Sequence, residues 1–424
     1  MPQANKKHVS KYQEFDHKIF PAGTKGVWVN EKSDGRYSLI NEEICLPAAV
    51  IRESAIKNNL NWMQQFANHH QVRLSPHGKT TMTPALFSEQ LEAGAWGITV
   101  ATPAQAETAA IAGAKHILMA NQLVGKANMA LIARLMHQHD VQLYACVDSC
   151  ENAAQLSRFF SEASLTLNVL IEYGVPGGRC GCRNHEEVET LAGFIQAAKG
   201  LRLYGLEVYE GVIHGADAED KIRLFLRDAV MLVEQLTEKK LITVDSPIIT
   251  GAGSAWYDIV ADEFSAHPHL TAIIRPGCYL IHDTGIYQDA QQQVMSRARR
   301  NQGYACELGG DLESALELWA YVLSVPEACK AVIGMGKRDV AFDAGLPLVE
   351  RGFRDGQPLN VQGLEATAIM DQHTFVNVPA GCDLKVGDIL VFSTSHPCLT
   401  FDKWRYISVA DDTDTVTHFV DTRF

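Results

Sequence analysis

The apolar positions of this chain change their spacing along the sequence. From about residue 70 to residue 285, short and almost continuously apolar runs are separated by longer amphipathic stretches. Strands of a parallel sheet are covered on both faces, so they read as unbroken apolar runs rather than as alternating ones. We predict eight such strands, which begin near residues 71, 96, 116, 141, 165, 201, 246 and 270.

The stretches between these runs carry the periodicity and the end signals of helices. "TPALFSEQLEAGA" has Thr83 as a cap, Pro84 in the first turn and Gly94 at its end, and "TPAQAETAAIAGA" repeats this arrangement. "HEEVETLAGFIQAAKG" and "DAEDKIRLFLRDAVMLVEQLTEKK" are amphipathic helices as well. Eight strands that are each followed by a helix most simply close into a (β/α)8 barrel, and a doubly wound open sheet is the alternative.

Beyond about residue 286 the pattern becomes that of antiparallel strands. Short alternating runs separated by Gly, Pro and Asp occur in "LWAYVLSVPE", "KRDVAFDAG", "EATAIMDQHTFVNV", "KVGDILVFST" and "WRYISVAD". Residues 24–46 resemble a hairpin that joins this β domain, and the polar residues 288–312 are predicted to form a linker or surface loop. The predicted organisation is an N-terminal segment (1–46) packed with the β domain, a barrel (47–285) and a C-terminal antiparallel β domain (286–424).

Composition narrows the class of protein. The chain has 424 residues and a formal net charge of -13, and an acidic chain without basic runs argues against nucleic acid as a partner. We expect no membrane segment, because no apolar stretch approaches the roughly 20 residues that a spanning helix needs. The N-terminus lacks the apolar core of a signal peptide, and ten cysteines in so long a chain are not a disulfide framework. We therefore expect a cytoplasmic protein with reduced thiols.

Polar residues gather where the predicted strands end. In a (β/α)8 barrel the active site lies at the carboxyl ends of the strands. The candidates there are His77 and Lys79 after the first strand, Arg179 after the fifth, Tyr209 at the end of the sixth, Gly251, Gly253 and Ser254 after the seventh, and Tyr279 after the eighth. The "GKT" of "SPHGKTTMT" is not a phosphate-binding P-loop, because that motif needs a glycine where Arg73 stands.

The glycine pair and the lysine together indicate a cofactor. Barrels often bind a phosphate group with the loops after strands seven and eight, where glycines let backbone N–H groups approach closely. A lysine across the barrel mouth from a phosphate site suits pyridoxal phosphate, whose aldehyde forms a Schiff base with an amine. We interpret Gly78 as the clearance that lets Lys79 point into the mouth. A phosphosugar enzyme with a Schiff-base lysine would use the same residues, so the pattern leaves both open.

A second constellation lies in "STSHPCLTFDKW", residues 393–404. His396 and Cys398 are two positions apart, so on a strand both side chains would face the same side. Imidazole and thiolate ligands suit zinc, and two protein ligands would leave coordination positions for water or substrate. The alternative is that the pair only packs in a core.

These motifs together resemble a known family. "PHGKT", "RCG" after the fifth strand, the glycine pair, "RPGCY" and "HPCLTFDKW" resemble the D-serine dehydratase and D-threonine aldolase family, from about residue 45 to residue 410. These are fold-type III pyridoxal phosphate enzymes, related in fold to alanine racemase. The resemblance implies a homodimer, Lys79 as the Schiff-base lysine, and His396 and Cys398 as the metal ligands. From their positions at the strand ends we expect Gly251, Gly253, Ser254 and Tyr279 around the phosphate and Arg179 and Tyr209 near the cofactor ring. His77 either joins this site or supports the turn that carries the lysine.

The resemblance also suggests a reaction. Its dehydratase branch pairs histidine with cysteine, whereas the aldolases usually pair it with aspartate, so Cys398 favours a dehydratase that releases a 2-oxo acid and ammonia from a β-hydroxy-D-amino acid such as D-serine. The alternatives are retro-aldol cleavage to glycine and an aldehyde, and a non-catalytic pyridoxal phosphate carrier. Ser75, Thr81 and Val212 depart from residues common in the family, and these departures concern the substrate rather than the cofactor.

Overall fold

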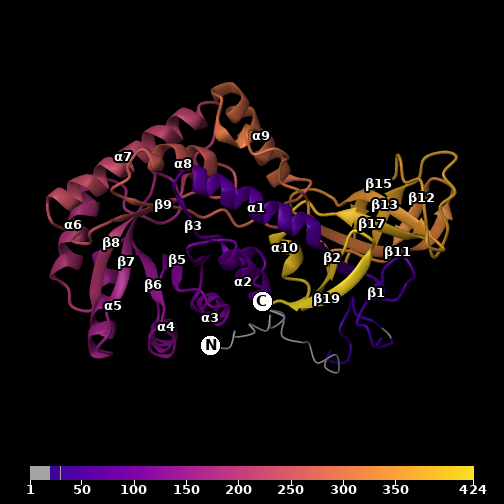
Figure 1. Ribbon diagram of the computed structural model, residues 1–424, viewed down its shortest axis with the longest axis horizontal. Helices are drawn as coiled ribbons and strands as arrows, with labels where there is room; N and C mark the ends of the chain where they lie inside the picture. Colours follow the sequence, from indigo (N-terminus) through magenta and orange to yellow (C-terminus); the bar gives the residue numbers. More distant parts are fainter. Residues whose placement is uncertain (1–19, 29) are drawn as a thin grey trace, which may run out of the picture.

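The computed structural model describes residues 20–28 and 30–424, and in it two sheets divide the molecule (Figure 1). The first sheet has eight parallel strands in the order β3-β10-β9-β8-β7-β6-β5-β4. Its strands are β3 (Arg73–Leu74), β4 (Ile98–Val100), β5 (His116–Gln122), β6 (Gln142–Val147), β7 (Leu167–Tyr173), β8 (Leu201–Val208), β9 (Ile248–Gly251) and β10 (Thr271–Ile274). Each lies within one of the eight predicted runs.

The sheet curls until its two ends meet. The N–H of Trp96 donates to the carbonyl of Leu74 at 2.8 Å, and the N–H of Thr99 donates to the carbonyl of Pro76 at 2.8 Å. These bonds connect the segment that contains β3 with the segment that contains β4. The predicted (β/α)8 fold class is therefore confirmed, and the open-sheet alternative is wrong.

Helices cover the outside of the barrel. They are α1 (Glu53–His69), α2 (Pro84–Glu92), α3 (Pro103–Ile111), α4 (Lys126–Gln138), α5 (Cys150–Glu162), α6 (His185–Ala197), α7 (Ala218–Glu238), α8 (Tyr257–Ser265) and α9 (Ile286–Asn301), with short 3-10 turns η1 (Gly78–Thr80), η2 (Glu210–Val212) and η3 (Tyr304–Cys306). Thr102 caps α3 as predicted, by accepting the N–H of Gln105 at 3.3 Å. Thr83 stands at the N-cap of α2 without a cap bond, because its hydroxyl donates to the carbonyl of Thr81 at 2.8 Å. Among the described helices, none is long and apolar enough to cross a membrane.

Helix α9 occupies residues 288–301 of the segment predicted as a loop over 288–312. Its buried residues mix the apolar Val294, Met295 and Ala298 with the polar Gln291 and Arg297, and this mixture weakens the apolar periodicity of a helix. Gln291 accepts the hydroxyl of Tyr257 at 2.6 Å and donates to Asp311 at 2.7 Å. Arg297 donates to both carboxylate oxygens of Asp258, at 2.7 and 2.8 Å, and thereby ties α9 to α8.

The second sheet has eleven strands. They are β1 (Tyr37–Ser38), β2 (Ala48–Arg52), β11 (Leu316–Glu327), β12 (Lys330–Ile333), β13 (Leu348–Arg354), β14 (Gln357–Pro358), β15 (Glu365–Ile369), β16 (Thr374–Asn377), β17 (Ile389–Ser393), β18 (Tyr406–Ala410) and β19 (Thr415–Asp421), and the short helix α10 (Cys398–Phe401) follows β17. Almost all pairings are antiparallel, as predicted. The exception is β2, which pairs in parallel with β18 and antiparallel with β11.

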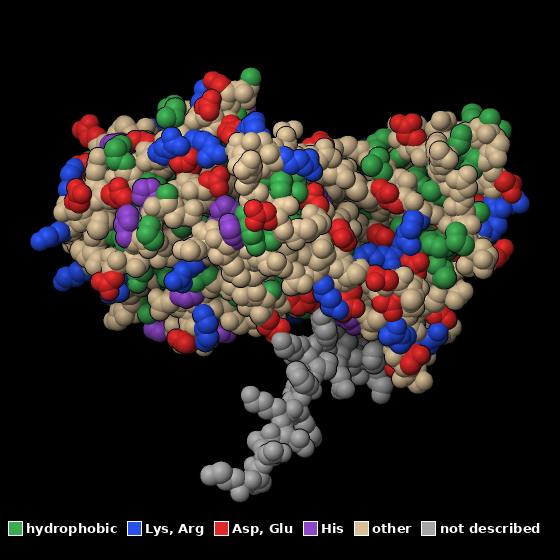
Figure 2. All heavy atoms as spheres, turned by 45° about the horizontal axis from the view of Figure 1, so that its top comes forward, with side chains coloured by type: hydrophobic (Ala, Val, Ile, Leu, Met, Phe, Trp, Pro, Cys, Tyr) green, Lys and Arg blue, Asp and Glu red, His purple; other side chains and the backbone are tan. Residues whose placement is uncertain are grey.

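Two sequence predictions near this sheet can be compared with it. "KRDVAFDAG" forms no strand, because Asp339 holds a turn there by accepting the N–H of Gly336 at 3.0 Å and the ammonium of Lys25 at 2.7 Å. The segment 24–46 does join the sheet, since β1 pairs with β19 and Trp28 bridges to Ile44. Figure 2 shows basic and acidic side chains interspersed over one face of the molecule, with no continuous basic patch on that face.

Candidate active site

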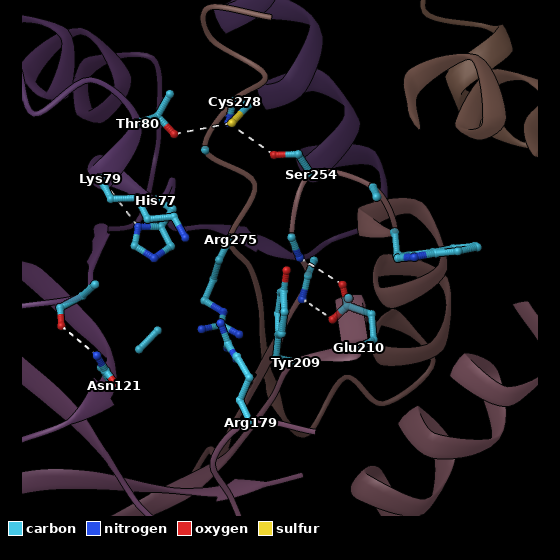
Figure 3. Close-up of a pocket in the computed structure, with 18 of the residues that line it drawn as sticks. His77, Lys79, Thr80, Asn121, Arg179, Tyr209, Glu210, Ser254, Arg275 and Cys278 are labelled. Carbon is cyan, nitrogen blue, oxygen red and sulfur yellow. Dashed lines mark hydrogen bonds between the residues drawn. The ribbon is translucent and has the colours of Figure 1, made fainter. Parts of the chain in front are cut away.

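A cavity of about 530 Å³ opens at the carboxyl ends of the barrel strands (Figure 3). Six of the predicted cofactor residues line it: His77, Lys79, Arg179, Tyr209, Gly253 and Ser254. Gly251 and Tyr279 are not among the described residues that line it. The carbonyl of Gly251 accepts a bond from Arg275 at 3.3 Å, and the hydroxyl of Tyr279 accepts one from Gln90 at 3.0 Å.

Lys79 follows the first barrel strand and lies in a tight turn. Lys79 lies in η1, where a Cβ placed on Gly78 would come within 2.4 Å of the Phe87 ring. No side chain fits there, which is the physical reason for the glycine before the lysine. The N–H of Lys79 donates to Nδ1 of His77 at 3.4 Å. Burial, and then the positive charges of Lys79 and Arg275, hold the pKa of His77 well below its usual value, which keeps the imidazole neutral and able to accept this bond.

The glycine loop after β9 is held by a carboxylate that the sequence did not point to. Glu210 accepts the N–H of Ala252 and the N–H of Gly253, each at 3.0 Å, and its side chain is fully buried. These two donors are therefore already bonded. Ser254 and Ala255 follow directly and precede Trp256, the N-cap of α8, so the loop leads to a helix start, where N–H groups without intrahelical partners can bind an anion.

A second glycine shapes the other side of this loop pair. A Cβ on Gly277 would lie 2.6 Å from the carbonyl oxygen of His77, so only glycine lets the two segments approach. The Oγ of Ser254 accepts the N–H of Cys278 at 3.2 Å and joins the loops after β9 and β10. Ser254, Gly277 and Cys278 line the same cavity as Lys79. The hydroxyl and the close glycine backbone of this loop pair fit a phosphate group such as that of pyridoxal phosphate.

The two arginines near the cavity have different surroundings. Arg275 is buried and donates to the carboxylate of Glu207 in a close ion pair and to the carbonyl of Val208 at 2.8 Å. It lines the cavity, but these bonds hold its guanidinium against the barrel strands. The guanidinium of Arg179 lies 4.2 Å from the centre of the Tyr209 ring and is exposed, so this is the arginine that can contact a cofactor ring.

Glu172 is a third buried carboxyl group at this end of the barrel, and it lines the cavity. Burial, and then the negative charge of Glu207, raise the pKa of Glu172 to about 7, while Gln122 donates to it at 2.6 Å. The acidic residues inside the apolar runs "NVLIEYG" and "YGLEV" could have indicated Glu172 and Glu207, because a carboxyl group in a buried strand needs a partner.

The predicted metal ligands lie at the start of α10, not on a strand. β17 ends at Ser393, His396 follows in the connecting turn, and Cys398 is the first residue of α10. The Sγ of Cys398 lies 3.4 Å from Oγ1 of Thr80, the residue after Lys79, and 3.5 Å from Sγ of Cys278. The fold thus places the β-domain pair beside the lysine turn.

The chemistry of this pair fits a zinc ion. Hydrogen bonding from Cys278 is the largest cause that lowers the pKa of Cys398 to about 5, with His396 contributing, so a thiolate is available at neutral pH. Hydrogen bonding to Cys398, and then to Asp343, raises the pKa of His396 to about 9. The Nδ1 of His396 lies 2.7 Å from Oδ2 of Asp343, an arrangement that fixes ring orientation and leaves Nε2 for a metal.

Tyr287 and Asn121 are cavity residues that the sequence did not predict. Tyr287 comes from the first turn of α9, just before the segment 288–312 that was predicted as a loop, and its ring centre lies 6.1 Å from that of His396. Asn121 stands near the end of β5, and its amide donates to the carbonyl of Ala101 at 3.3 Å.

Comparison with known proteins settles the family. Residues 51–284 match the family described as alanine racemase, N-terminal domain, and residues 315–410 match the putative serine dehydratase domain. The chain belongs to the alanine racemase N-terminal domain family. The resemblance predicted from the motifs is thus confirmed.

Relatives of this alanine racemase family member include enzymes of two reaction types. The chain is 28% identical to D-threonine aldolase of Arthrobacter sp over 362 residues, which cover 84% of this chain and 86% of that protein. The solved D-threonine aldolase of Filomicrobium marinum superposes with a TM-score of 0.74 at 22% identity, over 91% of this chain and 96% of that one. The solved D-threo-3-hydroxyaspartate dehydratase of Delftia sp. HT23 superposes with a TM-score of 0.71 at 21% identity, over 91% of this chain and 99% of that one. The two solved structures support the fold.

Proposed function

We propose that this protein is a pyridoxal phosphate- and zinc-dependent dehydratase that converts a β-hydroxy-D-amino acid such as D-serine into a 2-oxo acid and ammonia. Aldolases and dehydratases are both lyases, and the sequence relatives include both, a D-threonine aldolase and a D-threo-3-hydroxyaspartate dehydratase, so the predicted lyase class is confirmed. The observation that carries the dehydratase proposal is the contact between Cys398 and Thr80 at 3.4 Å, which joins a histidine–cysteine pair to the lysine turn.

The position of each cavity residue suggests its role in the proposed reaction. Bound pyridoxal phosphate would supply an electron sink for a pair of electrons left at the α-carbon. The amine of Lys79, held by the turn at Gly78, takes the α-proton. Ser254 and the start of α8 bind the phosphate end, and Arg179 with Tyr209 orients the ring.

The second element of the proposal is assistance to the leaving group. His396 and Cys398 would hold a zinc ion, whose Lewis acidity eases departure of a β-hydroxyl. Asp343 keeps the His396 ring in the orientation that binding needs. A solved D-threo-3-hydroxyaspartate dehydratase variant with a cysteine replaced by alanine is in a metal-free form. We also propose a cytoplasmic homodimer.

Retro-aldol cleavage is the second candidate, because a D-threonine aldolase is similar over 84% of this chain. Both reactions start from the same cofactor and lysine, but one breaks the α-carbon–hydrogen bond and the other the α-carbon–β-carbon bond. The products therefore separate them: a 2-oxo acid with ammonia, or glycine with an aldehyde.

The test is turnover of D-serine, L-serine, D-threonine and D-threo-3-hydroxyaspartate by the purified protein. The 2-oxo acid and glycine are followed in parallel, before and after chelation and zinc addition. We expect a 2-oxo acid from D-substrates alone, lost on chelation and recovered with zinc. Glycine as the product would move the protein to the aldolase reaction, and bound cofactor without any turnover would favour a carrier.

A further inference from the structure

Three metal-binding side chains meet on the barrel surface, away from the cavity. Glu234 comes from the C-terminal half of α7, and His267 and His269 come from the turn between α8 and β10. α7 and α8 lie side by side (Figure 1). Because α7 leads away from the carboxyl end of β8 and the turn leads into the amino end of β10, the cluster lies at the barrel end opposite the cavity.

The distances in this cluster suit one ion. The Oε1 of Glu234 lies 3.2 Å from Nδ1 of His267 and 3.1 Å from Nε2 of His269, and one ligand atom from each of the three lies within 4.8 Å of the others. Ligands bound at about 2.1 Å stand roughly 3.0–3.4 Å apart around one ion in octahedral or tetrahedral geometry. The Glu–His distances fall in that range.

The backbone of the turn holds its histidines in place without a metal. The N–H of His267 donates to the carbonyl of Phe264 at 3.1 Å, and the N–H of Leu270 donates to the carbonyl of His267 at 2.9 Å. The side chains of His267, Glu234 and His269 are 32%, 38% and 57% exposed, so an ion could reach them from solvent and keep water ligands.

We propose that Glu234, His267 and His269 form a second metal site, which takes a divalent transition ion of the Zn²⁺, Ni²⁺ or Cu²⁺ type. Two imidazole ligands select these ions over Mg²⁺ and Ca²⁺, which prefer oxygen. The site is independent of His396 and Cys398. An ion there links α7 to the α8–β10 turn, and it stabilises the folded chain because the unfolded chain lacks the arrangement.

The experiment counts bound metal. Untagged full-length protein is saturated with Zn²⁺, passed through gel filtration and measured by mass spectrometry of the metal. We expect the double variant His267→Ala/His269→Ala to retain one equivalent fewer than the wild-type protein, with unchanged turnover. Variant His137→Ala, which removes an exposed histidine from α4, should retain the wild-type amount.

Two further experiments can refute the proposal. In a His396→Ala background, Zn²⁺ should still raise the melting temperature, and Glu234→Gln in that background should weaken Zn²⁺ binding by about tenfold or more, since it removes one of three ligands. Equal metal content in wild-type protein and the double variant would overturn the proposal. So would a Zn²⁺-induced rise in melting temperature that survives both histidine substitutions. Neither result depends on which reaction the barrel catalyses.

Discussion

The sulfurs of Cys278 and Cys398 lie 3.5 Å apart, although 120 residues separate them in the sequence. Cys278 follows the last barrel strand and Cys398 opens α10 in the β domain. Two thiols at this distance need only small side-chain movements to reach bonding distance. The chemical state of Cys278 in the barrel therefore affects Cys398, the proposed metal ligand in the β domain.

We expect hydrogen peroxide to join these two cysteines in metal-depleted protein. One thiol is oxidised by peroxide and then attacked by the other, so that two thiols and one peroxide give one disulfide and two waters. Thiol titration should show two fewer free thiols, peptide mapping should identify the pair, and zinc binding should be lost until a dithiol reductant is added. Cys278→Ser should abolish the response, and Cys306→Ser, at an exposed cysteine, should keep it.

Lys79→Ala should remove turnover through loss of the proton acceptor. General-base groups contribute about 10²–10⁴-fold to rate, so kcat should fall by at least that range. The absorption band of lysine-bound pyridoxal phosphate should vanish as well, while added cofactor still binds. Lys126→Ala, at an exposed lysine that starts α4, should retain both properties. An unchanged absorption band in Lys79→Ala would place the cofactor on another amine.

Asp343→Asn should weaken zinc binding without removing a ligand. Partners that orient a metal-binding histidine typically contribute about 10- to 100-fold in metal affinity. Competition with a chromophoric chelator should show a loss of that size for Asp343→Asn and a larger one for His396→Ala. Asp140→Asn, at a solvent-exposed aspartate, is the matched control. Equal affinities in Asp343→Asn and wild-type protein would leave the 2.7 Å contact without a role in binding.

Glu210→Gln should loosen the loop after β9. The amide supplies one acceptor in place of two and turns an NH₂ group toward a backbone N–H, so a buried donor is left unpaired. That costs about 1–3 kcal/mol, which urea denaturation of wild-type and variant proteins would measure. Cofactor affinity should fall in the same variant. Glu186→Gln, on the exposed first turn of α6, should change neither quantity.

The stability of the barrel should depend on pH through His70. Burial, and then the charge of His69, lower the pKa of His70 from 6.5 to about 4. The folded chain therefore binds fewer protons than the unfolded chain between these values, and stability is present above pH 6.5 and lost as pH falls toward 4. The loss is at most about 3 kcal/mol.

The measurement for His70 is the free energy of unfolding from pH 4.5 to 7.5. Other buried groups titrate in this range, so the difference between wild-type protein and His70→Gln isolates the contribution. The difference should shrink as pH falls. His137→Gln should run parallel to the wild-type curve, and a constant offset for His70→Gln would show that burial of His70 has no effect on its titration.

The sequence predicted the eight barrel strands because buried parallel strands are unbroken apolar runs, and few other segments of the chain show such runs. It did not predict α9, because two of the buried residues of that helix, Gln291 and Arg297, are polar and bind partners in other segments. Nor did it predict that Glu210 would occupy the N–H groups assigned to a phosphate. Those relationships join segments far apart in the sequence, and local spacing carries no information about them.

The place of β2 in the second sheet has a consequence for biosynthesis. β2 leaves the ribosome before the barrel, yet its two neighbours in the sheet, β11 and β18, both follow the barrel in the sequence. This part of the sheet cannot form until β18 has been made, and the turn that carries His396 and Cys398 lies between β17 and β18. A nascent chain with a folded barrel would thus hold its lysine turn before the histidine–cysteine pair can lie beside it.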